Sequence, residues 1–228
     1  MPEHTPSSVL VARLSSVHAG QPCSQQVILD EIRRVILAGD APPGTSIPLE
    51  AVAGFFAVSP IPVRESLKTL IGEGLVDHEP RGGYRVARLT REEMREFYVI
   101  REVLEAAALR IAVKRARPAD DLAAAEIHRV LGEAIAAKDP REYHRESRRF
   151  HLALLTPSAM YRLLHMFELA WNVTEPSQPM ATVDAAQLDR MHADHAAMLK
   201  AFLARDPDEL VRCSRKHYRR LERAVDSV

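Results

Sequence analysis

The sequence has few aromatic residues, few glycines and only two cysteines. Aromatic residues make up 5% of its 228 residues, glycine occurs 9 times, and the cysteines are Cys23 and Cys213. This composition argues against a β-sandwich or barrel and favours a mostly helical chain rich in alanine, leucine and arginine. Two cysteines are too few for a disulfide framework, so we expect reduced thiols and a cytoplasmic protein.

Net charge and long apolar runs are also missing. Lys plus Arg and Asp plus Glu each number 31, so no overall field draws the chain to nucleic acid or to an anionic membrane. Any contact with DNA must therefore be local. No apolar run approaches the roughly 18 residues that a membrane span needs, and the first twenty residues do not resemble a signal peptide. We expect no membrane partner.

The remaining pattern predicts two domains, preceded by a flexible arm. Residues 1–21 are small, polar and without period, which predicts the arm. Residues 22–88 combine short helices with a hairpin, and residues 89–228 contain only helical patterns. The capping box that begins at Thr90 opens the second domain. Its six helices are predicted at about 90–116, 118–137, 140–156, 158–172, 184–204 and 207–226.

Two prolines mark the most informative helix start in the smaller domain. Pro60 and Pro62 stand two residues apart, a spacing that a helix tolerates only in its first turn. Ser59 is therefore the predicted N-cap, and a tight turn joins this helix to a preceding one at 49–56. Two strands around a Gly-rich turn at 80–83 follow. This order predicts a winged helix-turn-helix.

Arg64 lies in the first turns of that helix, where a recognition helix contacts base edges. An isolated exposed arginine would be read as a solvated surface residue. The two prolines, the following wing and the Arg81-Gly82-Gly83 turn favour a DNA contact instead.

Several segments resemble the GntR family of winged-helix regulators over about residues 24–88. They are Val58-Ser59, Pro62-Val63-Arg64-Glu65-Ser66-Leu67, Glu73-Gly74-Leu75-Val76 and Arg81-Gly82-Gly83-Tyr84-Arg85-Val86. The resemblance implies a homodimer on double-stranded operator DNA and a set of DNA-binding residues. These are Ser59, Ile61, Arg64, Lys68, Arg81, Gly82 and Gly83. The family usually has arginine where this chain has Pro60, which implies a different operator sequence.

The second half resembles the effector domain of the FadR-like branch, an FCD-type antiparallel bundle of six helices around a ligand cavity. Arg101-x-x-Leu104-Glu105 carries its first-helix pattern, and helical spacing turns Arg101 toward the core. A buried arginine needs an anion. Either an i,i+4 pair with Glu105 or a small carboxylate effector satisfies this requirement, and the two are compatible.

Three histidines lie on the apolar faces of three different helices: His151, His195 and His217. A single core histidine is usually only hydrogen-bonded, but three can converge on one divalent cation. Metal-binding FCD domains place an aspartate four residues before the first of these histidines, where this chain has Ser147. The resemblance therefore implies a transition-metal site (Zn, Ni or Mn) that lacks one carboxylate, with Ser147 near the effector.

These patterns predict a transcription repressor released by a carboxylate effector. A metal-dependent hydrolase that uses the histidine-lined cavity is the alternative, since a bound metal can activate water. The sequence offers no well-placed general base for it, and we expect no enzyme. A helical metal-storage protein would leave the wing unexplained.

Overall fold

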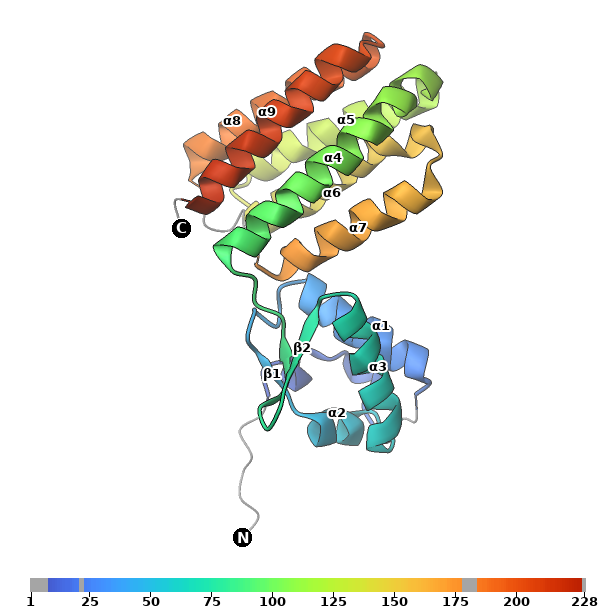
Figure 1. Cartoon of the computed structure of the whole chain (residues 1–228), viewed down its shortest axis with the longest axis vertical. Helices are drawn as coiled ribbons and strands as arrows, with labels where there is room; N and C mark the ends of the chain where they lie inside the picture. Colours follow the sequence, from blue (N-terminus) through green and yellow to red (C-terminus); the bar gives the residue numbers. More distant parts are fainter. Residues whose placement is uncertain (1–7, 21–22, 178–183, 227–228) are drawn as a thin grey trace. The chain divides into compact units, whose positions relative to one another are not determined.

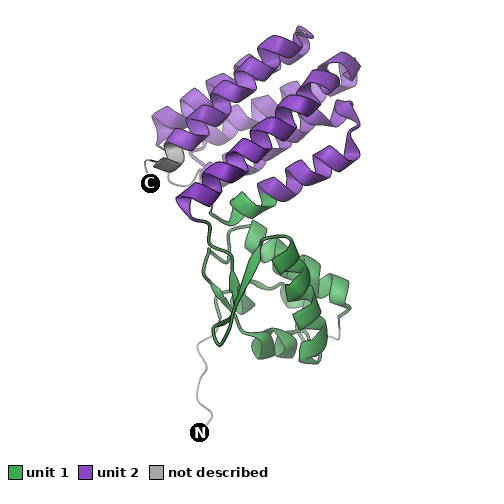
Figure 2. Cartoon of the chain, in the orientation of Figure 1, with its two compact units in different colours: residues 1–89, 172–177 green, residues 90–171, 178–228 purple. Residues whose placement is uncertain are grey.

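The computed structural model describes residues 8–20, 23–177 and 184–226. It divides into two compact units, residues 1–89 with 172–177 and residues 90–171 with 178–228 (Figure 2). The division after Leu89 lies one residue from the boundary that the sequence suggested. Among the described residues, no helix is long and apolar enough to cross a membrane.

Within the described residues before Leu89, three α-helices and a small sheet make up most of the first unit (Figure 1). The helices are α1 (Gln25–Leu37), α2 (Leu49–Phe55) and α3 (Pro60–Gly72). Their apolar faces meet in one core, because each helix repeats its apolar residues at helical spacing. The fully buried residues of this core include Ile28, Ile32, Val35, Val52, Phe56, Val63, Leu67 and Leu70.

The sheet consists of β1 (Ser46–Ile47), β2 (Val76–Glu79) and β3 (Gly83–Val86). Its strand order is β1-β3-β2, with antiparallel pairing throughout. The predicted hairpin is therefore present. Strand β1 was not predicted, because two residues are too few to show an alternating pattern.

The predicted flexible arm over 1–21 is wrong for residues 8–20. This segment forms short 3-10 helices at Val11–Arg13 and Ser16–His18, and it buries Leu10 and Leu14 in the core of the first unit. The Ser15 backbone N–H donates to Oε1 of Glu31 at 2.5 Å. Two leucines four residues apart span a single helical turn, which is too short a pattern to predict an ordered segment. Residues 1–7 and 21 lie outside the described part.

Six long helices make up most of the second unit, as predicted. They are α4 (Arg91–Arg115), α5 (Pro118–Ala136), α6 (Pro140–Leu155), α7 (Tyr161–Thr174), α8 (Ala185–Leu203) and α9 (Pro207–Asp226). The Thr90–Glu93 capping box is present. Helix α7 begins three residues later than predicted, because residues 156–158 form a 3-10 turn and Ala159 has a positive φ of 53°.

Helices α4, α5, α6, α8 and α9 pack against one another in the pairs α4–α9, α8–α9, α5–α6 and α5–α8. Figure 1 shows the long helices of this unit running roughly side by side. Leu109, Phe150, Leu154 and Phe202 are among the fully buried residues of their common core. Polar side chains from α4, α6, α8 and α9 are buried in the same unit, and they form the candidate site.

Candidate metal centre and DNA-binding surface

Three imidazoles converge in the second unit. His151 comes from α6, His195 from α8 and His217 from α9, and all three side chains are buried. One ring nitrogen of each lies within 4.8 Å of the others. The sequence placed each histidine on a core-facing stripe, and the fold brings the three stripes together.

The free nitrogens of these rings fit a metal. His151 Nε2, His195 Nε2 and His217 Nδ1 are buried without a hydrogen-bond partner among the described residues, and such an arrangement is costly unless a ligand occupies it. Burial first, and nearby positive charges second, lower the pKa of His195 and His217 well below the ordinary histidine value. Neutral imidazoles are the form that binds a transition metal.

Glu105 on α4 orients one of these rings. His151 Nδ1 lies 2.9 Å from Oε1 and 3.0 Å from Oε2 of Glu105. Burial alone would raise the pKa of Glu105, but His151, Tyr218 and Arg101 bring it below its usual value, so the carboxylate is ionised and only accepts hydrogen bonds. A neutral His151 that donates to this carboxylate carries its proton on Nδ1, which leaves the Nε2 lone pair for a metal.

Two hydroxyl groups complete the environment of Glu105. Ser214 donates to Oε1 at 3.1 Å and Tyr218 to Oε2 at 2.6 Å. On the neighbouring ring, the Tyr143 hydroxyl lies 3.3 Å from Nδ1 of His195. Sequence reasoning had considered Glu105 only as a partner of Arg101 and had missed these three hydroxyl-bearing residues. Their partners lie 52 to 113 positions away along the chain, so no local spacing indicated them.

Arg101 is buried, as its helical position predicted. Its guanidinium carbon lies 3.4 Å from the centre of the Trp171 ring, within a group of aromatic side chains that includes Tyr98 and Tyr218. A cation held over an indole face is stabilised by the ring's negative face. Arg101 thus supplies a positive charge inside the unit.

Arg101, His195 and His217 line one cavity, together with Ser147. Ser147 is buried one turn before His151, at the position where the family resemblance calls for an aspartate. The cavity offers about 20 Å³ to the centre of a water-sized molecule. It therefore has room for an ion or a water molecule, and a larger ligand must displace side chains.

A second candidate surface lies at the start of α3 in the first unit. Ser59 is its N-cap residue, with Pro60 at the first helical position. The Ser59 side chain makes no capping hydrogen bond, because the third helical residue, Pro62, has no N–H to donate. Ile61, Arg64 and Lys68 are exposed, and they share one face of the helix because they recur every three or four residues. Lys68 Nζ is paired with Glu65 at 2.9 Å.

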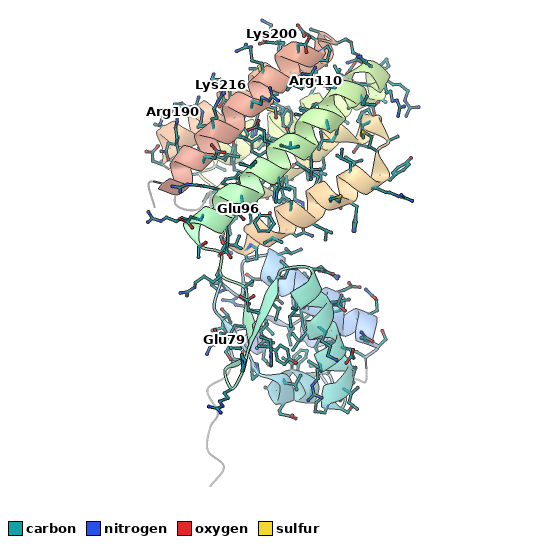
Figure 3. The ribbon with its side chains drawn as sticks, in the orientation of Figure 1. Glu79, Glu96, Arg110, Arg190, Lys200 and Lys216 are labelled. Carbon is teal, nitrogen blue, oxygen red and sulfur yellow. The ribbon has the colours of Figure 1, made fainter. Side chains whose placement is uncertain are left out.

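The wing is the turn between β2 and β3. Arg81 is exposed at its tip with a positive φ of 71°, and Gly83 follows with a φ of 77°. A Cβ at Gly82 would lie 2.8 Å from Cβ of Glu79, the wing residue labelled in Figure 3, so glycine at this position avoids a close contact. Gly82 and Gly83, which follow Arg81, have no side chains, so neither of them covers Arg81.

Comparisons with known proteins match both units. The model for bacterial regulatory proteins of the gntR family covers residues 24–86, and the FCD domain model covers residues 96–220, more than half of the chain. The chain belongs to the GntR family. It is a DNA-binding transcription regulator with an FCD domain, as predicted, and not the metal-dependent hydrolase of the alternative.

Individual relatives agree with this assignment. The chain is 27% identical to the HTH-type transcriptional repressor GlaR of Escherichia coli over 195 residues, 82% of this chain and 88% of the relative. It is 26% identical to the repressor RspR of the same organism over 217 residues, 91% of each chain. Among solved structures, E. coli McbR/YncC has a TM-score of 0.78 at 22% identity, covering 89% of this chain and 97% of its own. That structure supports the fold alone.

Proposed function

We propose that this GntR-family chain is a homodimeric repressor that a small carboxylate effector releases from operator DNA. The effector would bind in the cavity lined by Arg101 and Ser147, beside a divalent transition metal on His151, His195 and His217. The observation that carries this proposal is the convergence of three unpaired imidazole nitrogens and one buried arginine in a single unit.

The chemistry of the donors favours a late first-row ion. Three neutral nitrogens suit zinc or nickel, whereas an added carboxylate would favour manganese. A bound ion would supply an electrophilic centre to a carboxylate oxygen. Arg101 would pair with the same carboxylate and thereby compensate its charge in the buried cavity.

The size of the cavity links effector binding to a conformational change. Because the space available is close to that of one water molecule, a carboxylate of several carbons must move cavity side chains such as Trp171. A ligand that binds only the widened state shifts the population toward it. We infer that this widened state binds the operator less tightly, which is the behaviour of an inducible repressor.

We assign the proposed DNA-contacting residues to different parts of the DNA. Ile61, Arg64 and Lys68 on the exposed face of α3, with the Ser59 hydroxyl at its start, would enter the major groove. Arg81, with Gly82 and Gly83 keeping the turn narrow, would contact phosphates or the minor groove.

Metal content tests the central part of the proposal. After loading and dialysis, wild type should retain close to one zinc or nickel ion per chain and less manganese. His151→Ala, His195→Ala and His217→Ala should each lose it, and Ser147→Asp should raise manganese occupancy because the new carboxylate lies one turn from His151. His165→Ala on the exposed face of α7 is the matched control and should keep the ion. An empty wild type together with an empty Ser147→Asp variant would overturn the metal assignment.

A further inference from the structure

Helix α7 contributes residues to both compact units. Its residues up to Trp171 belong to the second unit, whereas residues 172–177, which include its end, belong to the first. Figure 2 shows the end of α7 in the colour of the first unit. No other described helix is divided in this way, so α7 is the described helix that carries residues of both the cavity and the DNA-binding unit.

Trp171 is the last residue of α7 in the second unit. Its ring lies over Arg101, with the guanidinium carbon 3.4 Å from the ring centre, and its centre is 5.3 Å from that of the His151 ring. The side chain is buried and lines the cavity of the candidate site. Because this cavity has room for little more than a water molecule, an acid that reaches Arg101 must displace the Trp171 ring.

The residues that follow Trp171 are buried in the first unit. Val173 and Thr174 end α7, and Glu175 and Pro176 begin a 3-10 turn, Glu175–Ser177, that packs against α1. All four residues are buried. The apolar surface that Val173 and Pro176 remove from water stabilises this packing. The end of α7 is thereby anchored to the DNA-binding unit.

Val173 contacts the turn that ends the proposed recognition helix α3. Gly74 in this turn has a φ of 74°, and across it the Leu75 N–H donates to the Leu70 carbonyl oxygen at 2.9 Å, which closes the helix. A Cβ on Gly74 would lie 3.1 Å from Cγ2 of Val173, so the glycine leaves room for a methyl group of the valine. Val173 therefore touches the end of the helix whose beginning carries Arg64.

The same turn is fixed to α1. Arg33 on α1 donates to both carboxylate oxygens of Glu73, the C-cap residue of α3, at 2.6 and 3.0 Å. Such a two-pronged pair holds its partners in one geometry, and the apolar faces of α1 and α3 share one core. A displacement of Val173 therefore acts on α1 and α3 together, because a packed core transmits strain.

Trp171 and Val173 lie in one helical turn. Two residues apart, they are about 200° from each other around the helix axis and about 3 Å along it, so their side chains point to opposite sides of α7. The backbone hydrogen bonds of the helix make this turn move as a unit. A tilt or rotation that moves Trp171 out of the cavity must also move Val173.

We propose that the last turn of α7 transmits the effector signal. A carboxylate that displaces Trp171 shifts Val173 against the Gly74 turn, and this shift lowers the affinity of the first unit for the operator. The inference rests on the proposed function and assigns a path for its coupling. Since Arg101 belongs to α4, the same displacement also acts on α4, and α7 adds the contact at Gly74.

Tryptophan emission follows the proposed displacement directly, because Trp171 is the only tryptophan of the chain. The zinc-loaded protein is titrated with acetate, lactate, succinate or citrate, with and without DNA from its own promoter. An acid that weakens operator binding about tenfold should shift the emission to longer wavelength, as the ring leaves its buried position. The DNA should raise the acid concentration at half of this shift by the same factor, because coupling is reciprocal. This measurement needs no variant.

Shortening Val173 tests the contact with Gly74. Val173→Ala removes both methyl carbons that face Gly74. Without DNA, the acid should still shift the emission at a concentration within about threefold of wild type, but it should weaken operator binding less than about twofold. Val173→Thr keeps a branched side chain at the contact and should respond as wild type does. Val130→Ala, at a partly exposed valine of α5, is the matched control and should also respond. Circular dichroism reports whether each variant stays folded.

The outcomes separate this inference from the proposed function. An acid that weakens operator binding without changing the emission of Trp171, or a normal operator response in Val173→Ala, would overturn α7 as the link, while the acid-responsive repressor would stand. Loss of the response in both Val173 variants would also overturn it, since destabilisation rather than the contact would then be the cause. A wild type whose operator affinity none of the acids changes would overturn the carboxylate switch and this inference with it.

Discussion

Glu105 is the residue on which the buried polar cluster depends. It accepts hydrogen bonds from His151, Ser214 and Tyr218 and has no exposed surface. Removing such an acceptor leaves several buried donors unpaired. Its proposed role is to hold His151 in the tautomer that keeps Nε2 available for a metal.

Replacing the carboxylate by an amide tests this role. Glu105→Gln should lower metal affinity by about 10–100-fold, the usual cost of losing an outer-shell carboxylate behind a histidine ligand. Competition with a chromophoric chelator measures this change. Glu102→Gln, on the same helix but partly exposed and paired with Arg215, is the control. Equal affinities in wild type and Glu105→Gln would contradict the orienting role.

At the scale of elements, the proposed contact with DNA is divided between α3 and the wing. Arg64→Ala removes a side chain that is exposed, so operator binding should be lost with a melting temperature within about 1 °C of wild type.

Arg81→Ala should weaken binding evenly across sequences and reduce the salt slope by about one, because phosphate contacts carry no base information. Fluorescence anisotropy at several salt concentrations checks both. If Arg81→Ala weakened binding to one operator sequence only, Arg81 would contact bases rather than phosphates.

The contact between α5 and α8 includes a stacked pair of histidines that no sequence pattern indicated. The rings of His128 and His192 lie 4.3 Å apart and nearly parallel. Burial lowers the pKa of both, and the charge of His128 lowers that of His192 further. Each histidine has a lower pKa in the folded chain than in the unfolded chain, so the unfolded chain binds more protons. The stability present above the unfolded-state pKa is therefore lost as the pH falls.

The melting temperature should therefore fall between about pH 7.5 and 5.5, and part of that fall belongs to this pair. In His192→Phe the fall should be smaller, because one ring no longer titrates. Differential scanning fluorimetry of both proteins over this range gives the comparison. The same fall in the variant and in wild type would show that the pair does not contribute.

Local patterns predicted the elements better than the contacts between them. The prolines of α3, the capping box at Thr90 and the apolar stripes fixed the helix positions, because propensity and periodicity act over a few residues. The same stripes placed three histidines and Arg101 in the interior. Strand β1, the ordered segment 8–20 and the hydrogen bonds of Glu105 depend on contacts with residues distant in the sequence. Patterns among neighbouring residues do not predict such contacts.

At the scale of the whole molecule, a regulator must connect its ligand cavity to its DNA-binding surface. Operator DNA is contacted by the first unit, and the cavity belongs to the second. Helix α4 begins directly after the boundary between them and carries Arg101 and Glu105. In the proposed function, a shift of α4 on effector binding is the simplest route between the two, and the coupling energy would be reciprocal.

The most direct test of this account is the operator affinity of the zinc-loaded protein, measured by anisotropy on DNA from its own promoter, with and without acetate, lactate, succinate or citrate. We expect at least one of these acids to weaken wild-type binding by about tenfold or more, corresponding to a coupling of over 1 kcal/mol. Arg101→Leu should bind the same DNA with wild-type affinity and ignore the acid. Equal operator affinity of wild type with every acid, or a normal response in Arg101→Leu, would contradict the carboxylate cavity as the switch.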